Sequence, residues 1–149
     1  MALQLSQETL RTSCPLATSL DLVGDRWMMV ILRDLFLGKN TFTEFLEAPE
    51  KISNTVLSDR LKRLHRIGLI SFINDKNNRK IKHYYMTDHG VELYPVIFEL
   101  MIWARKNMSF HYHEVAENFF ASIEGRDRVD IIAEAKADYT RKRDELLAS

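Results

Sequence analysis

Hydrophobic residues recur at three- and four-residue intervals through the first part of the chain, a spacing that predicts amphipathic helices. Thr41 and Ser53 stand directly before two of these segments, where short polar side chains favour a helix start. Glu44 follows Thr41 by three residues, so the two side chains form a capping box. Glycines, which favour helix ends, follow the segments. The pattern predicts four helices, at about residues 15–23, 26–37, 41–48 and 53–67.

The pattern then changes to two runs rich in β-branched and aromatic residues, at 69–73 and 81–86. Residues 74–80 between them are polar and turn-prone, so we expect a β-hairpin with a long basic tip. Three helices followed by a two-stranded hairpin is the layout of a winged helix-turn-helix, in which the second helix of the motif enters the DNA major groove.

Helical periodicity returns after the hairpin. Residues 87–108 predict one long helix that Pro95 should bend, because proline removes a backbone hydrogen bond. Two further amphipathic helices are expected at about 113–123 and 129–147, separated by Gly125. The fold class is therefore mainly α with a small β-hairpin (α+β).

Composition places the chain among globular proteins of one domain. It has 149 residues, of which 46% are hydrophobic and 28% charged. The single cysteine, Cys14, excludes an internal disulfide and suits a reducing compartment. Residues 1–13 lack a signal-peptide pattern, and no apolar run is long enough to cross a membrane. We expect a cytoplasmic protein that does not enter a membrane.

The formal net charge is zero, which by itself argues against a nucleic-acid partner. The charge is unevenly distributed, however. Residues 51–82 hold nine Lys or Arg and two Asp or Glu, a net charge of +7, and the rest of the chain carries −7. This basic block coincides with the two elements that would touch DNA, whose phosphates attract Lys and Arg. The alternative is that the basic run is an ordinary solvated surface.

Helical geometry assigns a DNA-facing side to the helix after Ser53. Leu57, Leu61 and Leu64 share one face, so the opposite face is free for DNA. We expect residues of this face and of the first helical turn to approach base edges, and we expect Arg63 and Arg66 to meet phosphates. The first group is Asn54, Thr55, Ser58, Asp59 and Lys62. In the hairpin tip, Lys76, Arg79 and Lys80 would approach the DNA backbone or the minor groove, unless the tip is only a mobile basic loop.

With these motifs identified, the chain resembles the HxlR family of bacterial winged helix-turn-helix transcription regulators over about residues 14–104. The resemblance rests on many spaced positions. They are Cys14-Pro15, Leu20 to Trp27, Ile31 to Leu35, Gly38, Phe42, Glu44-Phe45, Ile52-Ser53, Leu57-Ser58, Arg60-Leu61, Leu64, Gly68 to Ile70, Tyr84, Thr87 and Gly90.

The resemblance implies a homodimer, formed by the N-terminal segment and the long helix after the wing, that binds a pseudo-palindromic operator in double-stranded DNA. We accordingly expect a winged helix-turn-helix domain with its dimerisation helices at 1–108. Residues 109–149 extend beyond the family core and would pack on the same unit. The chain departs from the family at Thr41, where arginine is common, and at residues 79–81, where a proline pair is common.

The residues support a dimer independently of the resemblance. Apolar side chains occupy nearly every direction of the helix across residues 91–103, more surface than one small winged domain can cover. A partner chain would cover the remainder, or the C-terminal helices would fold back over it. A two-fold dimer would present its recognition helices about 34 Å apart, or a multiple of that distance.

Cys14 is the strongest candidate for chemistry. It precedes Pro15 at a helix start, where the helix dipole favours the thiolate. Some similar HxlR-type proteins sense electrophiles or oxidants through a cysteine at this position. With one cysteine, only a disulfide between subunits or an adduct with a small thiol can form. The alternative is a small residue buried at the dimer interface.

No sequence pattern points to an enzyme, a cofactor or a metal site. There is no Gly-rich phosphate loop, nucleophile elbow or paired acid motif. His111 and His113 with Glu114 and Glu117 have no distinctive ligand spacing. The other functional classes are a small-molecule-binding helical module and a protein-interaction adaptor without DNA binding. An unknown small molecule or oxidant could also act as an effector of a DNA-binding dimer.

Overall fold

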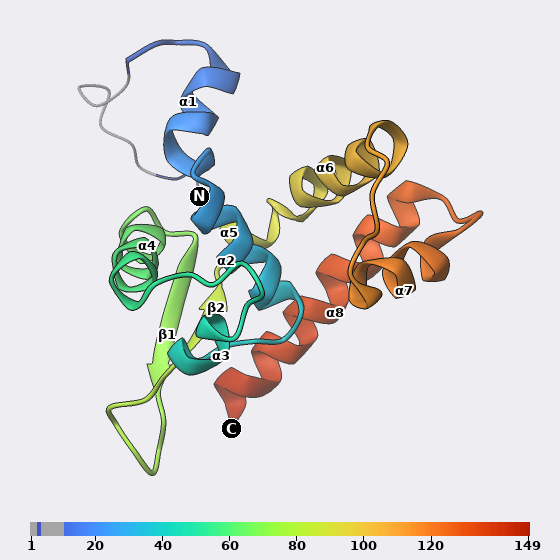
Figure 1. The fold of residues 1–149 in the computed structure, drawn as a ribbon. Helices are drawn as coiled ribbons and strands as arrows, with labels where there is room; N and C mark the ends of the chain where they lie inside the picture. Colours follow the sequence, from blue (N-terminus) through green and yellow to red (C-terminus); the bar gives the residue numbers. More distant parts are fainter. Residues whose placement is uncertain (1–2, 4–10) are drawn as a thin grey trace. The chain divides into compact units, whose positions relative to one another are not determined.

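A computed structural model of the chain describes Leu3 and residues 11–149 (Figure 1). These residues form two compact units divided between Val91 and Glu92, and each is described by itself below. Most of residues 1–13, in which the sequence shows no signal-peptide pattern, lies outside the described residues. The functional grouping of the chain into 1–108 and 109–149 stays a prediction.

The first unit has the predicted winged helix-turn-helix layout. In the described residues of this unit, four helices come first, and a two-stranded hairpin and one helical turn follow (Figure 1). The elements are α1 (Pro15–Val23), α2 (Arg26–Phe36), α3 (Phe42–Leu46), α4 (Asn54–Arg66), β1 (Ile70–Asn74), β2 (Lys82–Met86) and α5 (Asp88–Val91). The expected fold class, mainly α with a small β-hairpin, is confirmed.

The predicted helix boundaries follow from local hydrogen bonds. The Thr41 hydroxyl accepts from the Glu44 N–H at 3.3 Å, and the Glu44 carboxylate accepts from the Thr41 N–H at 2.9 Å, which is the expected capping box. The Ser53 hydroxyl accepts from the Val56 N–H at 3.3 Å and starts α4. Gly68 ends α4 with φ +82°, a left-handed conformation that disfavours other residues.

The core of the first unit lies where α2, α4 and the hairpin meet. Met28 and Leu32 of α2, Leu57 and Leu64 of α4, and Met86 of β2 are fully buried. The hairpin is antiparallel, with Ile70 opposite Met86 and Asn74 opposite Lys82. The buried leucines of α4 therefore fix which of its faces points outward.

The second unit holds three helices, α6 (Tyr94–Asn107), α7 (Glu114–Ile123) and α8 (Arg128–Ala148). One prediction was wrong: residues 87–108 are not one bent helix. The helix ends at Val91 and resumes at Tyr94, which places Pro95 in the first turn of α6. Proline lacks an N–H and clashes with the carbonyl four residues earlier, so it fits a first turn better than a helix interior.

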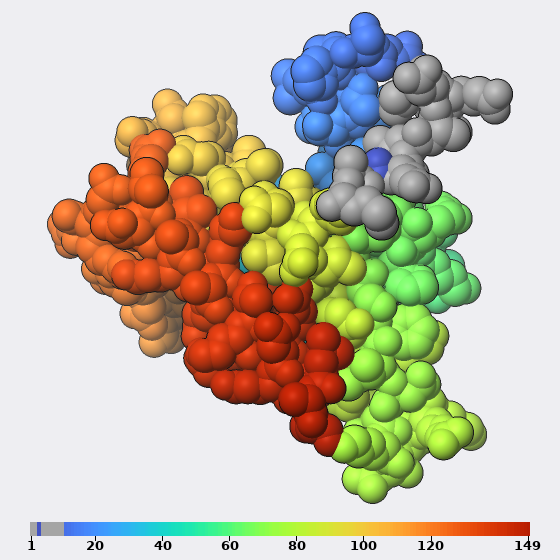
Figure 2. Space-filling model, turned by 180° about the vertical axis from the view of Figure 1, so that it is seen from behind, coloured from blue at the N-terminus to red at the C-terminus, as the bar shows by residue number. Residues whose placement is uncertain are grey.

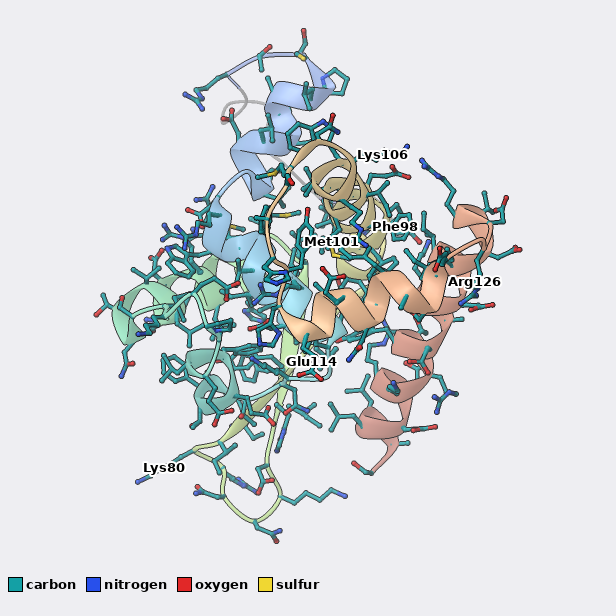
Figure 3. All side chains as sticks on the ribbon, turned by 45° about the vertical axis from the view of Figure 1, so that its right-hand side comes forward. Lys80, Phe98, Met101, Lys106, Glu114 and Arg126 are labelled. Atoms are coloured by element: carbon teal, nitrogen blue, oxygen red, sulfur yellow. The ribbon has the colours of Figure 1, made fainter. Side chains whose placement is uncertain are left out.

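Aromatic and charged contacts join the helices of the second unit. The ring of Phe98 on α6, labelled in Figure 3, lies 6.3 Å from that of Phe119 on α7. Arg105 stacks over Tyr112 and Phe120, with its guanidinium 5.7 and 4.9 Å from the ring centres. Among the described residues, no helix has the length and apolar character needed to cross a membrane.

Candidate nucleic-acid interface

Most of the residues of α4 that we predicted to contact DNA lie away from its buried leucines. Leu57, Leu61 and Leu64 are 0%, 3% and 0% exposed and hold the inner face against the core. The predicted residues on the opposite side are exposed, except Ser58 and Arg63, which are half-buried. The exposed ones are Asn54, Thr55, Asp59, Lys62 and Arg66. The arrangement can present hydroxyl, amide and cationic groups to a polyanion.

The basic side chains of α4 are used in two different ways. Within the part of the chain that the structure describes, neither Lys62 nor Arg66 forms an ion pair. Arg63, which we expected to meet a phosphate, donates through Nη2 to the backbone carbonyl of Asp21 at 2.8 Å. Lys62 and Arg66 are therefore available to a ligand, whereas Arg63 already has an acceptor inside the protein.

Arg60 belongs to the basic block of residues 51–82, and its side chain contacts two carboxylates. Its Nε and Nη2 donate to the two carboxylate oxygens of Asp25, each at 2.9 Å, and Nη1 donates to Asp59 at 2.5 Å. Asp25 also caps α2 by accepting from the N–H groups of Trp27 and Met28. The hydrogen bonds from Arg60 make the largest contribution to lowering the pKa of Asp25, and these two N–H groups lower it further. The pairing of Arg60 with Asp25 could not be predicted from the sequence, because the two residues lie 35 positions apart and no periodic pattern links them.

The predicted wing residues Lys76, Arg79 and Lys80 are exposed in the hairpin tip. Figure 2 shows this tip projecting from the rest of the first unit, and Figure 3 shows Lys80 pointing away from it. The Asp75 carboxylate closes the tip by accepting from the N–H groups of Asn77 and Asn78, both at 2.9 Å. The wing thus offers cations on a hydrogen-bonded loop.

His83 ties the base of the wing to the loop before α3. Its ring nitrogens lie 3.1 Å from the side-chain oxygens of Asn40 and Asp75. The Tyr84 N–H donates to the Asn40 carbonyl at 2.7 Å, so β2 is also anchored through its backbone. The hydrogen bond to His83 makes the largest contribution to lowering the pKa of Asp75, and the Asn78 and Asn77 N–H groups lower it further.

Lys51, also absent from the predicted site, lies just before α4. It is exposed, and its φ of +57° is in the left-handed region that non-glycine residues avoid. A lysine therefore occupies a backbone conformation in which glycine would be less strained. Sequence reasoning had no signal for this conformation.

Cys14 is exposed and occupies the N-cap position of α1, with Pro15 following it in the first turn. Its side chain makes no capping hydrogen bond. Among the described residues, no group of three or more His, Cys, Asp or Glu side chains is arranged to hold a metal ion. His111 and His113 are both exposed, and the His113 ring accepts from the Val115 N–H at the start of α7.

Comparison with known proteins gives a family match. The model of the HxlR-like helix-turn-helix family matches residues 22–112. The chain is 30% identical to the uncharacterized HTH-type transcriptional regulator YdeP of Bacillus subtilis over 116 residues, which cover 78% of this chain and 87% of YdeP. It is 34% identical to the uncharacterized HTH-type transcriptional regulator Rv3095 of Mycobacterium tuberculosis (strain H37Rv) over 57% of this chain, and it spans about half of that protein (53%).

Solved structures give the same picture. PA1607, a candidate transcription factor, is 30% identical with a TM-score of 0.62, over 69% of this chain and 72% of that chain. The reduced form of the B. subtilis transcriptional regulator YodB is 28% identical with a TM-score of 0.55, over 66% of this chain and 97% of that one. The quinone-bound form of YodB matches with 30% identity and a TM-score of 0.51, over 62% and 98% of the two chains.

Proposed function

This chain belongs to the HxlR-like helix-turn-helix family, and on that premise we propose that it binds a specific operator in double-stranded DNA as a homodimer and thereby regulates transcription. The family and the relatives are transcription regulators and not enzymes. Since such a regulator acts on the chromosome, we place the protein in the cytoplasm.

The observation that carries the proposal is that the cations on the outward side of α4 have no acidic partner among the described residues. Lys62 and Arg66 are exposed and, among the described residues, have no acidic partner, and the same holds for Lys76, Arg79 and Lys80 of the wing. Unpaired cations on a helix and an adjoining hairpin suit the phosphates on either side of a major groove. In this proposal α4 enters the groove, where Asn54, Thr55, Ser58 and Asp59 read base edges, and the wing contacts the flanking backbone. Lys62, which the sequence led us to expect at a base edge, is assigned here to phosphates together with Arg66.

Exposed apolar residues support the homodimer. Val96, Leu100 and Trp103 recur on one side of α6 and are 46%, 55% and 59% exposed. Leu16 and Leu20 of α1 are 68% and 56% exposed, one helical turn apart. A second copy covering these residues would create two recognition helices related by a two-fold axis, which suits a pseudo-palindromic operator.

We further propose that Cys14 makes DNA binding responsive to electrophiles or oxidants. Its exposed sulfur at the N-terminus of α1 supports this role, as does the likeness to a regulator crystallised with a quinone. A quinone would form a sulfur–carbon bond with the thiolate, and its ring would take up the proton. An oxidant such as diamide would accept two electrons and two protons as two thiols join, either to the partner subunit's Cys14 or to a small thiol.

Selection of duplexes from fragments of the source genome tests the proposal. We expect recovery of a common pseudo-palindromic sequence, with an affinity that falls steeply as salt rises. The selection is repeated after diamide or quinone treatment of the wild-type protein and of Cys14→Ser. Loss of binding in the wild type alone would support the sensor, and equal responses would refute it. Absence of any enriched duplex would refute DNA binding and favour a small-molecule or adaptor role.

A further inference from the structure

Two of the four Lys and Arg residues on α4 point at the protein itself. Arg60 donates to both carboxylate oxygens of Asp25 at 2.9 Å, and Arg63 donates to the Asp21 carbonyl at 2.8 Å. The two acceptors flank one short corner, since Asp21 lies in the last turn of α1 and Asp25 is the N-cap of α2. The side of α4 that carries these arginines is therefore tied to the α1–α2 corner at two points.

Contacts, and for Arg60 direction as well, distinguish these arginines from the cations that have no partner among the described residues. Arg66 lies only about 60° around the helix axis from Arg63 and differs from it in its contacts alone. Arg60 and Arg63 are three residues apart and project to neighbouring directions on the helix. Lys62 lies about 200° around the helix axis from Arg60. A planar guanidinium that meets a carboxylate through two parallel bonds tolerates little rotation, in contrast to a lysine ammonium. The Asp25–Arg60 fork thus restricts the rotation of α4 about its own axis.

We propose that Arg60 and Arg63 are positioning residues that set the orientation of the recognition helix against the α1–α2 corner, and that they are not phosphate ligands. This inference rests on the proposed function, because it assigns α4 as the element inserted into DNA. Positioning matters for base readout, which requires side chains to meet particular base edges. Non-specific binding depends on phosphate charge alone and tolerates a misplaced helix. Arg60 and Arg63 therefore serve specificity.

The structure indicates that the fork can be removed without unfolding α2. The Asp25 carboxylate accepts from the Trp27 and Met28 N–H groups in its own helix turn, and we expect these two bonds to persist when Arg60 is substituted. Asn is also a favourable N-cap residue, so Asp25→Asn removes the charge of the fork and keeps the cap. These substitutions probe orientation rather than helix formation.

The test measures two affinities and one slope for each variant. The probes are a duplex that the wild-type protein enriches from random-sequence DNA and a scrambled duplex of the same composition. Lys62→Gln and Arg66→Gln should weaken binding to both duplexes and lower the slope of log affinity against log salt by about 0.9 each. Arg60→Gln and Arg63→Gln should weaken the enriched duplex roughly 10-fold. They should leave the scrambled duplex and the slope unchanged.

Two variants guard against a trivial loss of structure. Arg60→Lys keeps the charge but cannot form the fork, so it should lose specific affinity as Arg60→Gln does. Asp25→Asn should also lower specific affinity, because it weakens the fork while it leaves the contact between Arg60 and Asp59 in place, so a loss shared with Arg60→Gln is due to the fork. Thermal unfolding and titration of the active fraction at high DNA concentration accompany every measurement.

The possible outcomes separate this inference from the function on which it rests. A lowered salt slope for Arg60→Gln and Arg63→Gln would make them phosphate ligands and overturn the inference. Unchanged specific affinity, or full rescue by Arg60→Lys, would overturn it as well. In all these cases DNA binding would stand. A wild-type protein that enriches no duplex would instead refute the proposed function, and this inference with it.

Discussion

The two units of the chain differ in how they use apolar side chains. All but four of the buried hydrophobic residues in the described part of the chain lie in the first unit. Eight of the twelve exposed large hydrophobic residues lie in the second, among them Leu100, Trp103 and Phe110. The first unit encloses a core of its own, whereas the second leaves apolar surface that another molecule can cover. The first unit therefore has the larger core, and the second unit has more of the exposed apolar surface that the proposed dimer would cover.

Ion pairing also differs between α8 of the second unit and α4 of the first. On α8 of the second unit, Arg141 and Lys142 pair with carboxylates three or four residues away on the same helix, among them Asp138. In the first unit, Lys62 and Arg66 have no such partner among the described residues. Arg141 and Lys142 are therefore paired within their own helix, whereas Lys62 and Arg66 are available to a ligand.

The largest effect should come from the core of the first unit. Leu57→Ala deletes a side chain that is 0% exposed, so it should lower the free energy of unfolding by about 2–5 kcal/mol. Val129→Ala on α8 removes a side chain that is 69% exposed and should cost less than about 0.5 kcal/mol. Urea denaturation of both variants checks the difference. Equal losses would contradict the division into a packed and an open unit.

The next largest effect should appear in assembly. Trp103→Ala removes the largest exposed side chain of the proposed α6 interface and should weaken dimerisation by about 2 kcal/mol, roughly 30-fold in the dissociation constant. Its effect on unfolding of the first unit should be small. Sedimentation across a concentration series measures the association. Val129→Ala, on another helix, is the matched control, and an unchanged dissociation constant for Trp103→Ala would remove α6 from the interface.

The fold was largely predictable because its signals are local. The capping box at Thr41 and Glu44, the glycine at 68 and the change of periodicity at residue 69 each depend on a few neighbouring residues, and the structure confirms all three. The break in the helix between Val91 and Tyr94 was not predicted, because Pro95 is compatible with two structures. A proline can bend a helix or start a new one, and periodicity continues through both.

For the candidate site, the sequence predicts which side of α4 is exposed but not the contacts that its arginines make. The spacing of four and three residues between Leu57, Leu61 and Leu64 predicts which side of α4 points outward, and the structure confirms that these leucines are buried. The partners of Arg60 and Arg63 lie 35 and 42 residues away in sequence, and no periodicity encodes such contacts. The left-handed Lys51 was equally hidden, since its backbone angle is set by the loop around it.

A smaller effect should follow from removing the capping box in the first unit. Thr41→Ala deletes the hydroxyl that accepts from the Glu44 N–H and should lower the free energy of unfolding by about 1 kcal/mol. Thr41→Ser keeps the acceptor and should stay close to wild type. Urea denaturation measures both, and a loss shared equally by the two variants would point to the Thr41 methyl group instead of the cap.

The smallest effect should be a difference in acid sensitivity between the two units. In the first unit, the backbone N–H groups of Asn40 and Thr41 lower the pKa of Glu44, and Arg33 lowers that of Glu50. A carboxyl group whose pKa is lower in the folded state stabilises the fold above its unfolded pKa, and this stability is lost as the pH falls through the folded value. The first unit should therefore lose stability from about pH 4.5 downward.

The two tryptophans make this difference measurable, because Trp27 lies in the first unit and Trp103 in the second. Trp103→Phe leaves a reporter of the first unit only, and Trp27→Phe leaves a reporter of the second. Between about pH 7 and about pH 2.5, a range that extends well below the unfolded pKa of Glu44, the urea midpoint reported by Trp27 should fall further than that reported by Trp103. Adding Glu44→Gln should reduce the fall seen by Trp27, because the substituted side chain no longer titrates. Equal falls at both reporters would mean that the units unfold together, and the contrast in their surfaces would then concern assembly and not stability.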